Sequence, residues 1–169
     1  MASEHIYKQY DADLQSIRAK VLEMGTIVEE QLSEAVQSLV DADTKLAEKV
    51  IRRDEEVNDL EIDIDEDCSL LIGKRSPVAA DLRNVLMMIK IIGDLERIGD
   101  ESTKIANATI RIIENDIMSK PQFKNINSML SSVQLMLRQA LNSFARLDTT
   151  ETIEVLEKDK EVDEEYRSH

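Results

Sequence analysis

The chain has 169 residues, of which 42% are apolar and only 3% aromatic, and its formal net charge is −14. Four glycines and two prolines, in a composition rich in Leu, Ile, Val, Ala, Glu and Lys, exclude a sheet-rich domain and indicate long helices. Such acidity argues against nucleic-acid binding and against anionic lipid surfaces, because both need Lys and Arg. It is compatible with cation binding, with a basic protein partner or with solubility alone.

Cys68 is the only cysteine, so the chain cannot form an intrachain disulfide. It lies on an apolar stripe, where we expect a small buried hydrophobic side chain. The sequence lacks a positively charged start followed by an apolar run, and no stretch approaches about 18 consecutive apolar residues. We therefore expect no signal peptide, no direct membrane insertion and a cytoplasmic location.

The first predicted helix covers residues 4–40, where apolar residues recur at steps of three and four. The residues of this stripe are Leu14, Ile17, Val21, Met24, Val28, Leu32, Ala35 and Leu39. Asp41 and Asp43 interrupt the pattern, and Asp43 is a suitable N-cap for the next helix.

The second predicted helix covers residues 44–72, and we expect Gly73 to cap its C-terminus. Its stripe is Val50, Asp54, Val57, Leu60, Ile64, Cys68 and Leu71. Ser76 and Pro77 form the N-cap and first turn of a third predicted helix, over residues 77–115. Its stripe is Val78, Leu82, Val85, Ile89, Ile92, Glu96, Gly99, Thr103, Ala106, Ile110 and Ile113.

A polar connection at residues 119–121 precedes a fourth predicted helix over residues 123–147, and Asp148 caps a fifth helix that runs to the chain end. Long helices joined by short turns pack as antiparallel neighbours. We therefore expect an all-α fold with a three-helix bundle in residues 1–117 and part of a second bundle in residues 122–169.

An internal repeat supports this division, because residues 35–61 resemble residues 140–166 at a constant offset of 105. The matching pairs include Ala35/Ala140, Ser38/Ser143, Asp43/Asp148, Thr44/Thr149, Val50/Val155, Asp54/Asp159, Glu56/Glu161 and Val57/Val162. A repeat indicates one structural unit used twice. Because the second copy stops at His169, we expect one complete unit and about half of another.

Two acidic residues interrupt the apolar stripes, and each has a polar partner one turn later. Asp54 precedes Asn58 on the second helix, and Glu96 precedes Asp100 on the third. Counting back and forward from the turn between these helices places the two pairs side by side. A further pair on the second helix, Glu61 and Asp65, misses this level by about 11 residues, or roughly 16 Å, and ranks lower.

These carboxylates have two interpretations, which the spacing leaves open. An all-oxygen cluster suits a hard cation such as Mg²⁺, Ca²⁺, Mn²⁺ or ferric iron, and neither histidine lies near it. Alternatively, the carboxylates lie at the bundle edge and pair with Arg52, Arg53 or Arg97. Gly99, inside a helix, indicates either a close approach by a backbone or ligand or relief of crowding between helices.

No catalytic constellation is present, because the sequence has no Ser/His/Asp set, no Cys/His set and no GxxxxGK[ST] loop. We therefore expect a protein that is not an enzyme. The methionines are expected to fill the core, and they include Met24, Met87, Met88, Met129 and Met136.

Four segments together resemble the PhoU family of phosphate-transport accessory proteins. They are SIRAKVLEMG (16–25), DADTKLAEKVIRRDEEVNDLE (41–61), KRSPVAADLRNV (74–85) and DLERIGDES (94–102). The resemblance begins near Tyr10 and covers nearly the whole chain. It implies a tandem pair of three-helix bundles, and no enzymatic activity.

The resemblance also implies a cytoplasmic regulator that works with the phosphate ABC transporter ATPase and a sensor histidine kinase to repress phosphate-starvation genes. Many members are homodimers, and some bind clusters of iron or other metals through E(D)-x-x-x-D motifs. Those motifs map onto Asp54/Asn58 and Glu96/Asp100, and in the second repeat onto Asp159/Asp163. No metal is required, but iron, zinc, magnesium or manganese would suit these positions.

The chain departs from the family in length, because the second ERIGD-like motif would fall beyond its end. Asp159 and Asp163 are therefore expected to form half a site, and the fourth and fifth helices to pack on the first bundle or on a second copy. We expect a short or truncated PhoU-like negative regulator of phosphate uptake and starvation signalling. The alternatives are an all-helical carboxylate protein that binds or stores metal and a structural coiled-coil adaptor, which the polar stripe positions disfavour.

Overall fold

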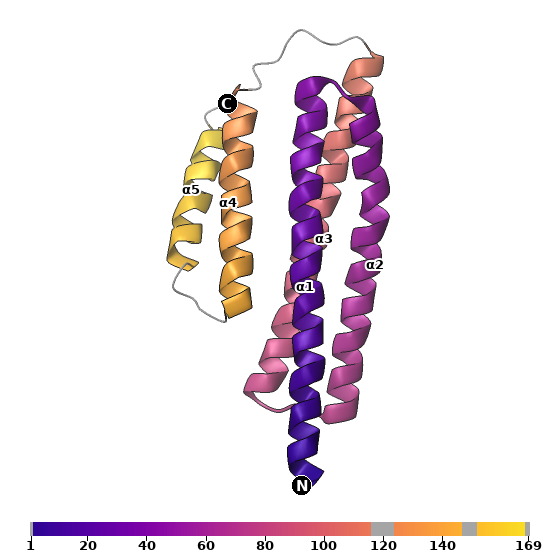
Figure 1. The fold of residues 1–169 in the computed structure, drawn as a ribbon. Helices are drawn as coiled ribbons and strands as arrows, with labels where there is room; N and C mark the ends of the chain where they lie inside the picture. Colours follow the sequence, from indigo (N-terminus) through magenta and orange to yellow (C-terminus); the bar gives the residue numbers. More distant parts are fainter. Residues whose placement is uncertain (1, 116–123, 147–151, 168–169) are drawn as a thin grey trace.

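The structure is a computed structural model, and it describes residues 2–115, 124–146 and 152–167 (Figure 1). Within these ranges all secondary structure is helical, which confirms the predicted all-α fold. The five helices are α1 (Ala2–Asp41), α2 (Thr44–Arg75), α3 (Ala80–Glu114), α4 (Lys124–Arg146) and α5 (Thr152–Arg167). None of these described helices is both long enough and apolar enough to cross a membrane.

Helices α1, α2 and α3 pack against one another as a long three-helix bundle. Its core forms two clusters, and the larger one contains most of the predicted stripe of α1, including Val21, Met24 and Val28, which are fully buried. From α2 and α3 it receives Val57, Ile64, Cys68, Leu71, Val85, Met88, Ile92 and Leu95. Steps of three and four along each helix thus place the apolar face toward two neighbours at once.

The turn between α1 and α2 follows the sequence prediction. The Asp43 side chain accepts a hydrogen bond from the backbone N–H of Leu46 at 3.1 Å, as an N-cap residue does. Ala42 is left-handed, with φ of 54°, and reverses the chain direction between the two helices.

The prediction that Gly73 caps α2 is wrong. The helix continues to Arg75, and Ser76 closes it in the left-handed conformation, with φ of 46° and ψ of 55°. The backbone N–H of Ser76 donates to the carbonyl oxygen of Ile72 at 2.9 Å. Gly73 has no positive φ, so its conformational freedom is not used there.

The predicted start of α3 is also wrong, because the helix begins at Ala80 and not at Pro77. Ser76 already ends α2 and cannot also cap α3, and a residue before proline disfavours the right-handed helical region. Ala79 occupies the N-cap position with φ of 50° and no side-chain hydrogen bond. Val78 consequently lies outside the helix and is 75% exposed, although the pattern places it on the apolar stripe.

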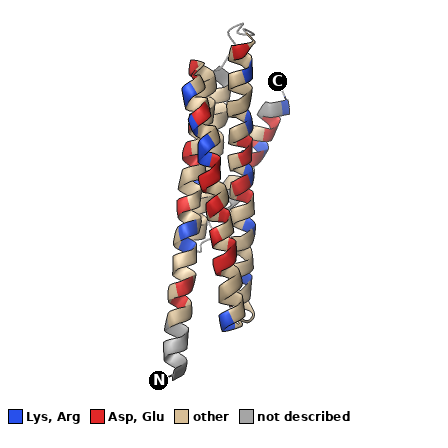
Figure 2. Ribbon diagram, turned by 90° about the vertical axis from the view of Figure 1, so that its right-hand side faces the viewer, with Lys and Arg blue, Asp and Glu red and all other residues tan. Residues whose placement is uncertain are grey.

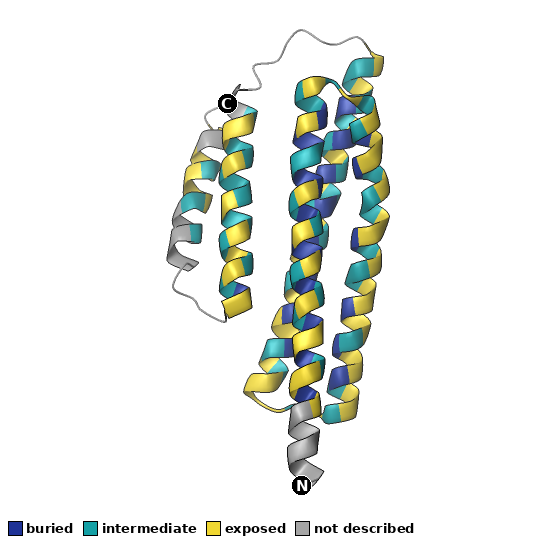
Figure 3. Cartoon of the chain, viewed as in Figure 1, coloured by how far each residue is buried: buried dark blue, intermediate teal, exposed yellow. Residues whose placement is uncertain are grey.

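Helix α4 packs on α1, and α5 packs on α4 (Figure 1). This arrangement confirms, for α4, the expectation that the added helices pack on the first bundle. In Figure 3 the buried positions gather in α1–α3, whereas α4 and α5 are mostly half-buried or exposed. Among the described residues of α4, Phe144 alone is buried.

The predicted fourth and fifth helices correspond to α4 and α5. Phe123, Leu147 and the expected cap Asp148 lie outside the described residues, as does the predicted polar connection at 119–121. The division into residues 1–117 and 122–169 stays a prediction.

Candidate metal centre between helices α2 and α3

The predicted acidic pairs lie on facing sides of α2 and α3. A Cβ added to Gly99 of α3 would lie 3.6 Å from Oδ1 of Asp54, and one added to Gly93 would lie 3.9 Å from Oε1 of Glu61. Asp54 therefore faces Gly99 and Glu61 faces Gly93, with Glu96 between these levels. We call Asp54, Glu61, Glu96 and Asp100 the acidic face.

This placement corrects the lower rank that the sequence gives to Glu61. Because α2 extends to Arg75 and α3 begins only at Ala80, the hairpin is centred further along the chain than the predicted turn. Glu61 therefore lies about one turn from the level of Glu96, comparable with Asp54 on its other side.

The carboxylates of the acidic face repel one another. Burial raises the pKa of Glu96, and the negative charges of Asp100, Glu61 and Asp54 raise it further, while Arg97 opposes them. In Figure 2 the acidic residues, in red, lie along neighbouring helices of the bundle. Such a cluster favours a proton or a cation.

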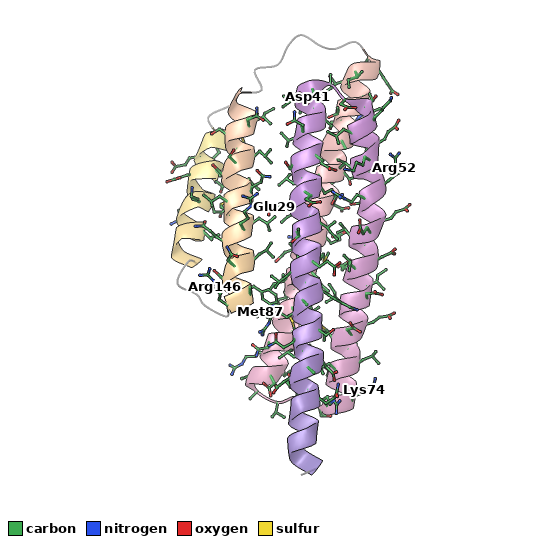
Figure 4. The ribbon with its side chains drawn as sticks, viewed as in Figure 1. Glu29, Asp41, Arg52, Lys74, Met87 and Arg146 are labelled. Carbon is green, nitrogen blue, oxygen red and sulfur yellow. The ribbon has the colours of Figure 1, made fainter. Side chains whose placement is uncertain are left out.

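The alternative that arginines neutralise these carboxylates gains no support from the ion pairs of the described chain. Arg53 pairs with Glu30 at 3.2 Å and with Glu34 at 3.4 Å, both on α1. Arg52 pairs with Glu48 at 3.8 Å and Arg97 with Asp94 at 3.5 Å, each on its own helix. Arg52 also points outward from the bundle (Figure 4).

Beneath the acidic face lies Gln31 of α1, a fully buried polar residue. Its Nε2 donates to Oδ1 of Asp54 at 3.2 Å, to Oγ1 of Thr103 at 3.4 Å and to the carbonyl oxygen of Val50 at 3.4 Å. Its Oε1 is buried without a hydrogen-bond partner. The helix pattern contains a signal for this residue, because Gln31 lies three residues after Val28 on the apolar stripe.

The residues present fit an oxygen-coordinated cation only in part. Across the described ranges, no three His, Cys, Asp or Glu side chains come close enough together to hold one ion. Asn58 is half-buried one turn after Asp54, and Gln31 Oε1 has no hydrogen-bond partner among the described residues. An oxygen-only set suits Mg²⁺ or Mn²⁺ rather than a soft metal.

The third predicted pair, Asp159 and Asp163, is not part of this face. Both residues are exposed on α5, which packs on α4 alone among the described helices. Asp163 pairs with Arg167 at 3.7 Å, one turn later on the same helix.

Comparison with known proteins agrees with the resemblance seen in the sequence. Residues 21–109 match the family described as PhoU domain. A Pseudomonas aeruginosa protein named phosphate-specific transport system accessory protein PhoU homolog is 39% identical over 166 residues, which cover 98% of this chain and 68% of that protein. The Escherichia coli K12 accessory protein PhoU is 40% identical over 164 residues, covering 97% of this chain and 67% of its own length.

Solved structures agree as well. The crystal structure of PhoU from Pseudomonas aeruginosa superposes with a TM-score of 0.89 at 39% identity, covering 94% of this chain and 76% of that one. The phosphate transport system regulatory protein PhoU from Streptococcus pneumoniae gives a TM-score of 0.85 at 28% identity, with 94% and 74% covered. The chain thus spans about two thirds of the length of its curated relatives, and it belongs to the PhoU family.

Proposed function

We propose that this protein is an accessory regulator of phosphate transport. It represses phosphate uptake and phosphate-starvation signalling through contacts with the ATPase of the phosphate ABC transporter and with a sensor histidine kinase, and it carries out no chemistry of its own. The observation that carries this proposal is the similarity, over nearly the whole chain, to proteins named phosphate-specific transport system accessory protein. The contacts would be made in the cytoplasm.

A role in protein contacts is compatible with the surface of the bundle and of α4, which exposes large apolar side chains. They are Ile62, Leu70, Val78, Leu86, Met87 and Leu135. Where such side chains form one contiguous patch, the surface is typical of those that bind another protein.

The proposal is tested by deleting the gene and by capturing partners with the purified chain. We expect phosphate-starvation reporters to become active in phosphate-rich medium after deletion, and the transporter ATPase and the kinase to be retained by the tagged protein. Reporters that stay repressed, together with retention of neither partner, would overturn it. A Leu70→Ser/Val78→Ser variant, which changes two exposed side chains, would then locate the contact surface.

A second candidate function, metal binding, is favoured by the acidic face. Repulsion among Asp54, Glu96 and Asp100 would be relieved by a divalent cation, and the alternative role of a carboxylate protein that binds or stores metal draws on the same residues. Metal content is measured for protein purified without chelator and for Glu96→Ala/Asp100→Ala. Equal metal content in the two proteins would rule the site out.

The homodimer implied by the family is part of the proposal. The apolar side chains of α4 are mostly half-buried, so a second copy could cover them further. Light scattering over a concentration series measures the mass. A strict monomer at the highest concentration would contradict a homodimer without affecting the other contacts.

A further inference from the structure

We propose that the outward face of α2, with the groove beside it between α2 and α3, is the docking surface for a basic amphipathic helix of a partner protein. We call this surface the α2 groove. Its apolar residues are Ile62, Leu70 and Ile89, and its acidic residues are Glu61, Asp65 and Glu66. The inference rests on the proposed regulation through protein contacts, and it names the surface and the chemistry of the partner segment.

Helix α2 leaves one of its faces uncovered. Among the described helices it contacts only α1 and α3, and in Figure 1 it lies on the side of the bundle away from α4 and α5. Ile62 is 56% exposed and Leu70 is 52% exposed. Two open hollows, of about 380 and 420 Å³, lie beside these residues, and Glu66 lines both. The two hollows therefore adjoin and form one surface.

The α2 groove has an apolar floor. Ile62 of α2 and Ile89 of α3 line the hollow of about 380 Å³, together with Ile92, which is only 1% exposed. Further along α2, Leu70 and Gly73 lie on the same outward face as Ile62. The distance along the axis from Ile62 to Gly73 is about 16 Å, or about three helical turns. An apolar strip of this length fits a helix laid along it.

The charge of the α2 groove identifies the kind of helix. From Asp54 to Asp67, α2 carries nine acidic residues and no Lys or Arg. Within the described chain Asp67 alone among them forms an ion pair, with Lys20 at 2.7 Å. The three carboxylates of the α2 groove therefore have no basic partner there, and they give the apolar floor a negative potential. A segment that brings Lys or Arg is complementary to this surface.

Two other occupants fit the charges less well. No three ligating side chains of the described residues converge on one ion, so the carboxylates are too dispersed for a metal. A second copy of this chain also carries a net charge of −14, so its approach is opposed by repulsion. Positive charges spaced along a polypeptide match carboxylates spaced along α2.

Gly73 indicates a close approach by another helix. The residue is exposed inside α2 without a positive φ, and a Cβ there would meet no atom within 4 Å. The packing of this chain thus gives no reason for glycine at a position where alanine would favour the helix. Bare backbone on an outward face does allow a partner helix to pack at a short interaxial distance.

The chain itself contains a contact of this type. Helix α4 has no acidic residue, and it packs on α1 with Leu141 directly on Gly25. Arg138 of α4 pairs with Glu29 of α1 beside that contact. A glycine of α1 is thus covered by an amphipathic helix that carries basic residues, whereas Gly73 of α2 is uncovered. The α2 groove offers the same combination of glycine, apolar residues and carboxylates.

The test measures the binding of a synthetic peptide to the full chain by fluorescence anisotropy. The labelled peptide has about 18 residues, with Leu along one helical face and Lys elsewhere. A scrambled peptide of the same composition lacks the apolar face and controls for charge alone. We expect the amphipathic peptide to bind at least about 10-fold more tightly. Equal affinities would mean that charge alone attracts the peptide, and the inference would be wrong.

Substitution of exposed apolar residues locates the peptide. Ile62→Ser/Leu70→Ser removes two apolar contacts from the α2 groove, and we expect the Kd of the peptide to rise at least about 10-fold. Met87→Ser/Leu135→Ser is the matched control, because it changes two exposed apolar residues that do not line the α2 groove. We expect its Kd to equal that of the wild type. An equal effect of both variants would place the peptide elsewhere and overturn the inference.

Substitution of carboxylates tests the charge requirement. Asp65→Asn/Glu66→Gln removes two negative charges from the α2 groove, and we expect the Kd to rise at least about 5-fold. Glu23→Gln/Glu114→Gln removes the same charge at exposed positions on α1 and α3 and should have a much smaller effect. If the two variants weaken binding equally, only the net charge of the protein matters and the α2 groove is not the site.

Gly73→Gln separates docking from folding. The larger side chain blocks close approach, so the Kd of the peptide should rise at least about 5-fold. Because glutamine favours a helix more than glycine does, urea unfolding should show a variant at least as stable as the wild type. Unchanged peptide affinity in this variant would contradict a close approach at Gly73.

The remaining outcomes distinguish the inference from the function on which it rests. If light scattering shows a dimer that Ile62→Ser/Leu70→Ser converts to a monomer, a second copy occupies the α2 groove and the inference is wrong. If the wild type retains the transporter ATPase and the kinase but binds both peptides equally, the proposed function holds and the inference is wrong. If it retains neither partner but prefers the amphipathic peptide, the docking surface holds and the proposed function is wrong.

Discussion

The side chain of Leu141 in α4 lies directly on Gly25 of α1, so close that a Cβ on Gly25 would be 2.6 Å from Cδ2 of Leu141. On either side of this contact, the Arg18 guanidinium lies 5.8 Å from the Phe144 ring centre, and Arg138 pairs with Glu29. Glu29 points from α1 toward α4 (Figure 4). Gly25 is thus the position on α1 where α4 packs closest against the first bundle.

Substitution of Gly25 should loosen α4 without unfolding the bundle. In Gly25→Ala the new methyl group forces Leu141 to move, but Leu141 is a flexible side chain, so α4 shifts and the core of α1–α3 stays intact. Hydrogen exchange measured by mass spectrometry should show faster exchange in α4 and unchanged exchange in α2 and α3. Faster exchange throughout α1–α3 would mean that α4 and the bundle unfold as one unit.

At Gly73, in contrast to Gly25, an added side chain should stabilise the protein. The residue is inside α2 with no positive φ, and a Cβ would meet no atom within 4 Å. Gly73→Ala should therefore stabilise the protein by about 0.5–1 kcal/mol, the usual gain when alanine replaces glycine in a helix. Urea unfolding measures the change, and a loss of stability would mean that Gly73 acts as the left-handed cap that the sequence predicts.

The core of α1 could be predicted well from the sequence, whereas the ends of the α2–α3 hairpin could not. Val21, Met24 and Val28 follow steps of three and four without interruption, and all are fully buried. Ser76 and Ala79 adopt positive φ values that neither residue type favours, so the packing of the two helices imposes the turn. A local pattern of capping residues cannot reveal a conformation that tertiary contacts select.

For the acidic face, too, some residues could be predicted from the sequence and others could not. Asp54 and Glu96 were predictable, because a charged residue on an apolar stripe is visible in the pattern. That Glu61 lies near Glu96 could not be predicted, since its position relative to α3 depends on which residues form the turn between α2 and α3. Gln31 lies on the apolar stripe three residues after Val28, but only the packed structure shows that its Oε1 is buried without a hydrogen-bond partner.

Cys68 should be unreactive in the folded protein. Its side chain is fully buried, and burial, with smaller contributions from Asp65 and Asp67, raises the pKa of its thiol to about 11. At pH 8 we expect reaction with a disulfide reagent to be at least about 100-fold slower in buffer than in urea, since both thiolate population and access are reduced. Comparable rates in the two conditions would show that the α2 core opens readily.

Glu96 should make the stability of the protein depend on pH. Burial and its acidic neighbours raise the pKa of its carboxyl, so the folded state holds the proton to a higher pH than the unfolded chain does. The resulting stability is fully present below the unfolded pKa, ordinarily about 4.5, and is lost as pH rises through the folded pKa. At neutral pH the ionised group therefore opposes folding.

We accordingly expect Glu96→Gln to be more stable than the wild type at pH 7, by less than about 1 kcal/mol because the side chain is partly solvated. The advantage should shrink as pH falls toward 4, where the wild-type carboxyl is protonated and resembles the amide. Urea unfolding at both pH values measures this difference, with Glu56→Gln, an exposed glutamate of α2, as the control. If the advantage of Glu96→Gln were the same at both pH values, or if Glu56→Gln reproduced it, charge repulsion at the acidic face would not be its cause.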